Sequence, residues 1–368
     1  MKLLRFALLV CTLIGIAPTA AYAVTVEDLF TVELPVADQT TSLRLESFSE
    51  AFKQVIVKVS GSDDALQSPA FKRPIENSAR YVKQFRYFNR SLPEGEDEEY
   101  DLDRLMLRID FDQQLIEGLL REQNFPVWGR ERPSTLLVVS YDVNENIKLV
   151  SDDATPDLVE ALDQAAAIHA VPVLFPLMDL EDIGLVSIGD IASRQYDNIN
   201  VMARRYSPNA LLVGSIVGRS GQGWQGDWEV RFDDQVFTWN FKASSKQVVI
   251  DQVIRQLAKT LAREYALDAQ QQFEQSLLLS VSEVEGIQKL IKVQQYLSSL
   301  NVVDSVRVAM VSRDVVTYRL QLRNNPEDLQ RLIEFGEVLE QEDFPQISTE
   351  GEEMIILNYS YINRGSGN

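Results

Sequence analysis

The chain has 368 residues, of which 45% are hydrophobic, and a formal net charge of −20 at neutral pH. A chain of this length and apolar content can bury the cores of two or three domains. A strongly acidic surface repels nucleic acid and anionic lipid headgroups, so neither is a predicted partner. One histidine and one cysteine are too few for the usual zinc sites. Beyond the N-terminal segment, no apolar run approaches the roughly 20 residues that a membrane-spanning helix needs.

The N-terminal segment 1–23 has the features of a secretory signal peptide. Lys2 and Arg5 precede a short apolar run, and an A-x-A sequence ends at Ala23. We expect cleavage after Ala23 and a periplasmic location for the mature protein. Cys11 lies inside the apolar run, without the small residues that precede a lipid-attachment site, so cleavage removes the only cysteine. The mature chain then has no disulfide bond, although it enters an oxidising compartment.

Residues 24–132 follow the pattern of a small α+β module. Leu29–Val36 alternates in the manner of a strand, and an amphipathic helix over 45–59 ends at Gly61, where a left-handed cap is expected. Two further strands, a second helix and a last strand near Trp128 complete the order strand–helix–strand–strand–helix–strand. This order is the split βαβ, or ferredoxin-like, arrangement.

Residues 133–270 alternate between strands and helices, which predicts a central α/β domain around one sheet. Three of its strands follow one another with short connections and should form an antiparallel meander. The expected elements, in chain order, are strands at 135–143 and 147–150, a helix at 157–170, a short strand at 171–174, a helix at 185–206, three strands between 209 and 241, and a helix at 248–265.

The meander combines aromatic rows with a glycine-rich connection. Aromatic residues alternate with polar ones on its last two strands, as on half-buried strands. The connection 218–226 holds four glycines, and Trp224 is expected in the turn. One interpretation is a core meander with a flexible tip. The other is a ligand-binding surface formed by Trp224, Arg219 and Gln222, because an aromatic platform suits the face of a sugar.

Residues 275–363 show the order strand–helix–strand–strand–helix–strand again, which predicts a second ferredoxin-like module. Asn325 and Pro326 mark the start of its second helix, and Leu339 is expected on the buried stripe of that helix. Two helices can cover only one face of a four-stranded sheet. The other face is either a solvated surface or a docking surface for a partner, and its candidate contacts are Thr317, Arg319 and Gln321.

The sequence shows no constellation of catalytic residues. A serine–histidine–aspartate triad would need His169, which lies at the end of a predicted helix, where the dipole favours an imidazole on structural grounds. No nucleotide-binding or nucleophile-elbow motif occurs. The acidic run 93–101 lacks the ligand spacing of an EF-hand and is interpreted as a solvated hairpin loop. No carboxylate pair stands out for hydrolysis, and no cofactor is predicted.

Three stretches of the chain carry a resemblance to a known family. They are VIVKVSG at Val55–Gly61, VPVLFPLMDLED at Val171–Asp182, and the segment Tyr206–Trp239. Together they resemble an uncharacterised secreted family of proteobacteria, domain of unknown function 2066. The resemblance covers most of the mature chain, implies a periplasmic setting in a Gram-negative cell, and brings no catalytic residues.

These features favour a non-enzymatic periplasmic protein that binds or scaffolds other envelope proteins through exposed sheet faces. The first alternative is a glycan- or small-ligand-binding protein that uses Trp224. The second is a hydrolase that uses carboxylates. A pocket near Trp224, a cleft with paired acids, or flat sheet faces alone would distinguish the three hypotheses.

Overall fold

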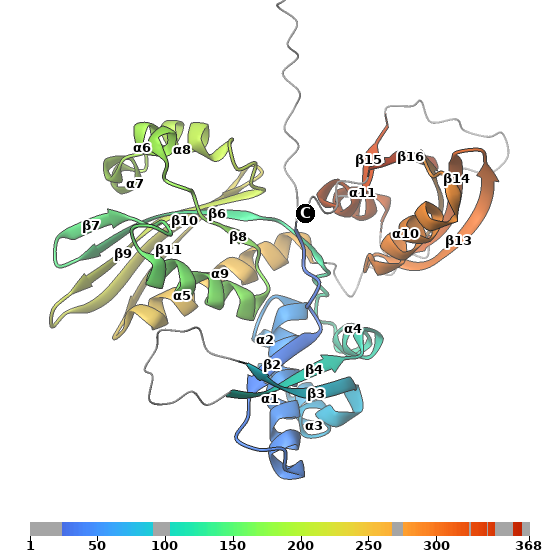
Figure 1. Ribbon diagram of the computed structural model, residues 1–368, viewed down its shortest axis with the longest axis horizontal. Helices are drawn as coiled ribbons and strands as arrows, with labels where there is room; N and C mark the ends of the chain where they lie inside the picture. The colour runs from blue at the N-terminus through green and yellow to red at the C-terminus, as the bar shows by residue number, and fades with distance from the viewer. Residues whose placement is uncertain are drawn as a thin grey trace, which may run out of the picture.

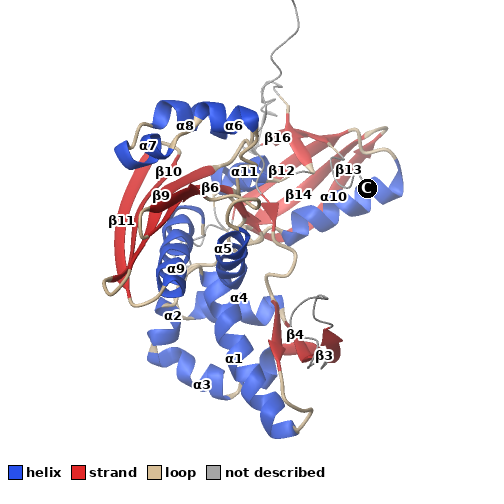
Figure 2. Ribbon diagram, turned by 60° about the vertical axis from the view of Figure 1, so that its left-hand side comes forward, coloured by secondary structure: helices blue, strands red, loops and turns tan. Residues whose placement is uncertain are grey.

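The computed structural model describes residues 24–90, 104–266, 275–323, 325–336, 338–342 and 356–362. The predicted signal segment with Cys11 and the acidic run 93–101 lie outside the described residues. The described part is a mixed α+β protein with helices and four β-sheets, which confirms the predicted fold class. Figure 1 shows the elements in an N-terminal, a central and a C-terminal group, and Figure 2 shows the central sheet between two layers of helices.

The N-terminal group has a three-stranded sheet, in the order β2-β4-β3, that shares its core with the long helix α1. α1 (Thr41–Ser60) ends at Gly61, whose φ of 69° is the predicted left-handed cap. The three strands are β2 (Thr31–Pro35), β3 (Val82–Arg90) and β4 (Arg104–Phe111). The remaining helices of this group are α2 (Asp64–Gln67), η1 (Pro69–Phe71), α3 (Lys72–Glu76), η2 (Ser78–Tyr81) and α4 (Gln113–Glu122).

The predicted fourth strand of the N-terminal sheet is wrong. After α4 the chain reaches Trp128, whose backbone N–H donates to the carbonyl of Val59, 2.7 Å away near the end of α1. The chain then forms β5 (Glu131–Arg132), which pairs with β1 (Val24–Thr25) in a separate two-stranded sheet. A carbonyl in the last turn of a helix needs a hydrogen-bond donor. The segment at Trp128 provides a donor for α1 and does not add a strand to the N-terminal sheet.

The central group is a six-stranded sheet in the order β11-β10-β9-β6-β7, with the short β8 also paired to β6. β6 and β9 run parallel, whereas β9, β10 and β11 form the predicted antiparallel meander. The strands are β6 (Thr135–Val143), β7 (Asn146–Leu149), β8 (Val173–Leu174), β9 (Ala210–Arg219), β10 (Gly223–Phe232) and β11 (Gln235–Ala243).

Helices cover both faces of the central sheet (Figure 2). α5 (Pro156–His169) and α9 (Lys246–Tyr265) pack on one face. The other face carries the short helices α6 (Leu180–Leu185), α7 (Ile188–Ser193) and α8 (Tyr196–Ala203). The prediction of one helix over 185–206 is wrong, because Ser187 begins a new helix with a capping box and Arg194, at a φ of 54°, ends it.

Two tryptophans lie flat on the central sheet because glycines beneath them leave room. A Cβ atom at Gly214 or Gly226 would overlap the ring of Trp228, and a Cβ atom at Gly218 would overlap the ring of Trp224. The placement of Trp224 in a turn is therefore wrong: it belongs to β10 and pairs with Gly218. Only residues 220–222 separate β9 from β10.

The C-terminal group has a sheet in the order β13-β14-β12-β16-β15, with the predicted sequence of elements and one additional strand. Because of the additional strand, β16 runs parallel to β12, so the ferredoxin-like arrangement is not confirmed. The additional strand corrects the assignment of Leu339, which lies on β15 because the preceding helix α11 ends before Gly336. The elements are β12 (Gln275–Ser282), α10 (Gly286–Ser299), β13 (Val303–Ser312), β14 (Val315–Leu322), α11 (Pro326–Phe335), β15 (Leu339–Gln341) and β16 (Ile356–Tyr361).

Arg132 joins the N-terminal group to the central group. Its side chain is fully buried and donates five hydrogen bonds to backbone carbonyls. These carbonyls belong to Lys58 in the last turn of α1, to His169 and Ala170 at the end of α5, and to the segment 128–129. A guanidinium suits this place because carbonyls at helix C-termini carry partial negative charge.

Candidate functional site

An apolar projection stands on the α6 side of the central sheet. The side chains of Leu177, Leu180 and Ile183 are 66%, 91% and 61% exposed, and all three come from one short segment. Figure 1 shows α6 on the opposite side of the sheet from α5 and α9. Single exposed leucines are common, but several large apolar side chains together are typical of a surface that contacts another molecule. We call Leu177, Leu180 and Ile183 the α6 knob.

A polar network fixes the backbone of the α6 knob from beneath. Asp182 is 0% exposed, accepts hydrogen bonds from Tyr206 and the backbone N–H of Met178, and forms an ion pair with Arg205. The Tyr206 hydroxyl in turn accepts from the backbone N–H of Leu177 at 2.8 Å. Hydrogen bonds therefore hold the knob segment at Leu177 and Met178 and, through Asp182, within α6. Its apolar side chains remain exposed to solvent.

The same network holds α6 at its N-terminus. Asp179 caps the helix by accepting hydrogen bonds from the backbone N–H groups of Glu181 and Asp182, each at 3.0 Å. Arg205 also bonds Asp179 at 2.7 Å, and this contact holds the pKa of Asp179 well below its usual range. Met178 just before the cap has a φ of 53°, a strained value for a side chain of this kind. A strained backbone that a buried carboxylate holds in place indicates a segment kept in one conformation.

A second candidate region is a cavity of about 370 Å³ between α7 and the same face of the sheet. Two carboxylates, Asp142 and Asp227, line this cavity, so they are the candidates for a hydrolase that uses paired acids. A hydrogen bond from Arg219 lowers the pKa of Asp142, which keeps that group charged. Asp227 accepts hydrogen bonds from Gln225 and Asn240. A general acid needs a raised pKa, so Asp142 does not suit that role.

The structure does not bring the predicted ligand contacts of the meander together. Arg219 lies at the end of β9 and bonds Asp142, whereas Trp224 packs against Tyr141. Tyr141 and Asp142 are neighbours on β6, so their side chains point to opposite faces of the sheet. Gln222 is exposed in the turn between β9 and β10. Trp224 and Arg219 therefore cannot line one common surface.

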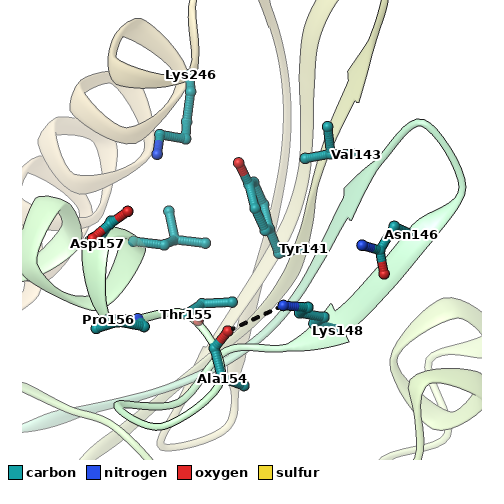
Figure 3. A pocket seen from close by; sticks show the side chains of 10 residues that line it. Tyr141, Val143, Asn146, Lys148, Ala154, Thr155, Pro156, Asp157 and Lys246 are labelled. Atoms are coloured by element: carbon teal, nitrogen blue, oxygen red, sulfur yellow. Dashed lines mark hydrogen bonds between the residues drawn. The ribbon is translucent and has the colours of Figure 1, made fainter.

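Trp224 instead stacks on Tyr141, and Tyr141 lines a third region, a cavity of about 240 Å³ beside the β6–β7 hairpin. The rings of Trp224 and Tyr141 are stacked, with centroids 6.1 Å apart and planes 10° from parallel. Figure 3 shows Tyr141 in the middle of this cavity, with Lys246 and Asp157 on the side of the helices and Asn146 on the side of the hairpin.

The predicted contacts on the C-terminal sheet share one face. Thr317, Arg319 and Gln321 alternate along β14 with residues of the buried core that α10 and α11 cover, so they lie on the other face. Thr317 is within hydrogen-bond distance of Ser280, 3.1 Å between hydroxyl oxygens. Arg319 is exposed and stands directly opposite Arg307 on β13. Like charges across a strand pair are unfavourable. Met310 on β13 stands opposite Thr317 and is 63% exposed, so this face combines charged, polar and apolar side chains.

The part of the chain that the structure describes gives no support for a metal site or for catalysis by His169. No group of three or more histidine, cysteine or acidic residues is close enough there to hold a metal ion. Burial and the nearby Arg255 guanidinium lower the pKa of His169 to about 4. The imidazole is thus neutral at the end of α5, and burial outweighs the helix dipole that the sequence interpretation invoked. Among the described helices, none combines the length and the apolar character that a bilayer crossing requires.

Comparison with known families gives one match. Residues 23–129 match a family model described as a domain of unknown function, DUF8605. This match supports an uncharacterised family for the N-terminal group, under a different number from the one that the resemblance predicts. No curated protein matches the sequence.

Sequence reasoning missed the α6 knob. Its leucines and isoleucine lie in the run LFPLMDLEDIG, where three acidic residues stand between them. A short helix with a spacing of three between apolar residues resembles a buried stripe, so its exposure could not be predicted from periodicity. The informative signal was the opening D-x-x-D pair at Asp179 and Asp182, because one acid caps the helix and the other is the buried partner of Tyr206.

Proposed function

We propose that this protein is a non-enzymatic periplasmic protein that binds another protein of the cell envelope through the α6 knob. The single observation that carries the proposal is the strong exposure of Leu177, Leu180 and Ile183 on a segment that buried hydrogen bonds hold in place. The signal-like segment 1–23 supports export, and the acidic composition supports a soluble partner or one with a basic rim.

The energetics of the α6 knob suit protein binding. Burying a leucine or isoleucine side chain contributes roughly 1.5–3 kcal/mol, so three such side chains offer on the order of 5 kcal/mol to a complex. The network at Asp182 and Arg205 fixes the knob before binding, which reduces the entropy lost on association. A partner with an apolar groove therefore gains most of this free energy without ordering the knob.

A double substitution tests the proposal. Leu180→Ser with Ile183→Ser removes most of the exposed apolar surface and leaves Asp182 and Arg205 in place. We expect capture of envelope proteins by the immobilised, purified protein to fall by about tenfold or more, and thermal stability to stay nearly unchanged because both side chains are exposed.

The matched control is Ile287→Ser on α10, whose side chain is 72% exposed. It removes one strongly exposed apolar side chain from another helix and should leave capture unchanged. Equal capture by the double variant and the wild-type protein would contradict the proposed role of the α6 knob. Equal losses in the double variant and the control would mean that binding is non-specific, which also contradicts it.

A further inference from the structure

We infer that the cavity beside the β6–β7 hairpin is a binding site for a small organic anion, a carboxylate or a phosphate ester. This site is independent of the α6 knob, because it lies on the side of the sheet that α5 and α9 cover. Its volume of about 240 Å³ is below the range of roughly 300–1,000 Å³ that drug-sized ligands occupy. The ligand is therefore of the size of a single sugar acid or a small metabolite.

Cationic and hydrogen-bonding groups converge on the cavity from three elements. Lys246 comes from the start of α9, Lys148 from β7, and the Tyr141 hydroxyl from β6. The Lys246 ammonium lies 5.8 Å from the centre of the Tyr141 ring, and Figure 3 shows both side chains directed toward the open space. An ammonium group, a phenol and an aromatic face together suit an anionic group attached to a ring or a short carbon chain.

Lys246 is the strongest argument for an anion. It is the first residue of α9, where the helix dipole makes a positive charge unfavourable, and no acidic residue occupies the first turn of that helix. It is half-buried, and among the described residues its ammonium contacts the Tyr141 ring and forms no ion pair or hydrogen bond. The helix dipole therefore does not favour a lysine at this position. The Tyr141 ring offsets part of its charge, and a bound anion would supply the counter-ion.

The other charged residues of the cavity have structural explanations. Asp157 stands in the first turn of α5, where a carboxylate is stabilised by the dipole. The Lys148 ammonium lies 3.5 Å from the carbonyl oxygen of Ala154, at the limit of a hydrogen bond. Asp157 repels an anion in the same cavity, so it limits affinity and does not provide it. Because Lys246 attracts an anion and Asp157 repels it, neutralising each residue should change the anion affinity in opposite directions.

Trp224 provides the readout. Its ring stacks on Tyr141, so a ligand that displaces water around Tyr141 changes the surroundings of an indole next to it. The experiment is a titration of the full mature protein at constant ionic strength, followed by tryptophan fluorescence and by calorimetry. The probes are glucuronate, inorganic phosphate and glucose. Glucose has the ring of glucuronate without the carboxylate, so it separates anion binding from general sugar binding.

We expect glucuronate or phosphate to bind and glucose not to bind. Lys246→Gln should weaken anion binding about tenfold or more, because it removes a charge-assisted contact. Asp157→Asn should strengthen anion binding by about threefold, because it removes a repulsive charge. Lys242→Gln is the control, since this exposed lysine points away from the cavity on β11 and should leave the affinity unchanged.

Three results would overturn the inference. The first is that neither glucuronate nor phosphate binds at millimolar concentration. The second is that glucuronate and glucose bind with equal affinity. The third is that the Lys246→Gln and Lys242→Gln variants lose affinity equally. Far-ultraviolet circular dichroism of each variant establishes that it is folded. None of these results bears on the α6 knob, so the proposed protein-binding role is tested separately.

Discussion

At the scale of single residues, Arg132 is a side chain on which several backbone groups depend. All five of its hydrogen bonds go to carbonyls, and its guanidinium also lies over the Trp128 ring at 4.0 Å. Removing it leaves buried acceptors at the ends of α1 and α5 without donors, and each such group costs about 1–3 kcal/mol. Sequence patterns gave no indication of this role, because an arginine in a polar segment is usually exposed.

Replacing Arg132 should therefore be strongly destabilising. We predict that Arg132→Met lowers the free energy of unfolding by at least about 3 kcal/mol in urea. Arg132→Lys should lie between this variant and the wild type, because an ammonium keeps the charge and offers fewer donors. Arg319→Met on the exposed face of β14 is the control and should change stability by less than about 0.5 kcal/mol. Similar losses for both methionine variants would contradict the assignment.

His169 should make the stability of the protein depend on pH. Burial lowers its pKa to about 4 in the folded state, against 6.5 for a free histidine. Between these values the unfolded chain binds a proton that the folded chain does not, so stability falls as the pH falls from 6.5 to 4. The difference corresponds to about 3 kcal/mol.

His169→Gln isolates this contribution from the many carboxylates that titrate in the same range. We predict that wild-type protein loses more stability than the variant on going from pH 7 to pH 4, measured by urea unfolding at each pH. Parallel pH profiles for the two proteins would show that the pKa of His169 is the same in the folded and the unfolded state, which contradicts the prediction.

At the scale of elements, the strands and helices with a clear period were predictable, and those fixed by distant contacts were not. α1 with its cap at Gly61, the meander and α9 follow from periodicity and glycine. The break of the segment 185–206 into separate helices depends on a capping box at Ser187, whose reciprocal partner Asp190 is visible in the sequence. The missing fourth strand depends on a hydrogen bond between Trp128 and Val59, which no local pattern reveals.

The candidate sites were less predictable than the fold. The sequence singled out Trp224, but the cavity is lined by Tyr141, on which Trp224 stacks and which lies far earlier in the chain, on β6. The exposure of the α6 knob also depends on tertiary contacts, because only the fold shows that no other described element covers Leu180. Composition argued against zinc sites and nucleic-acid binding, but it could not predict which surface is exposed for binding a partner.

Glycines of the central sheet leave room for the tryptophan rings, so adding a side chain there should reduce stability. At Gly226 a Cβ atom would overlap the ring nitrogen of Trp228 and Cγ1 of Val249, so Gly226→Ala should destabilise the protein by about 1–3 kcal/mol and shift the tryptophan emission. Gly118 on α4 has no neighbour within 4 Å of such an atom, and Gly118→Ala should stabilise by about 0.5–1 kcal/mol. Changes of the same sign in both variants would contradict the packing of Trp228.

At the scale of the whole molecule, three groups of elements have separate hydrophobic cores and a few fixed contacts between them. The C-terminal group reaches the N-terminal group through Asn301, whose side-chain amide donates to the carbonyl of Val127 at 3.0 Å. Lys259 on α9 forms an ion pair with Asp64 on α2 at 2.8 Å. With net charge −20, self-repulsion opposes compaction, so such cross-contacts matter for the arrangement.

Export gives a prediction for the whole chain. If residues 1–23 direct secretion and are removed after Ala23, the mature protein begins at Val24, the first residue of β1. Expression of the full-length gene product in a Gram-negative host, followed by intact-mass measurement of the periplasmic fraction, should give the mass of residues 24–368. A protein that retains Met1 and stays in the cytoplasmic fraction would contradict the proposed location.

The central claim is that the α6 knob, and no reactive side chain, performs the function. The most direct test places a photo-crosslinking amino acid at Leu180 or, as a matched control, at Ile287, in cells that produce the full protein. We expect discrete crosslinked species at Leu180 that are absent at Ile287 and are lost when Ile183 is replaced by serine. The same crosslinks at both positions, or none at Leu180 under conditions where a known contact crosslinks, would contradict it.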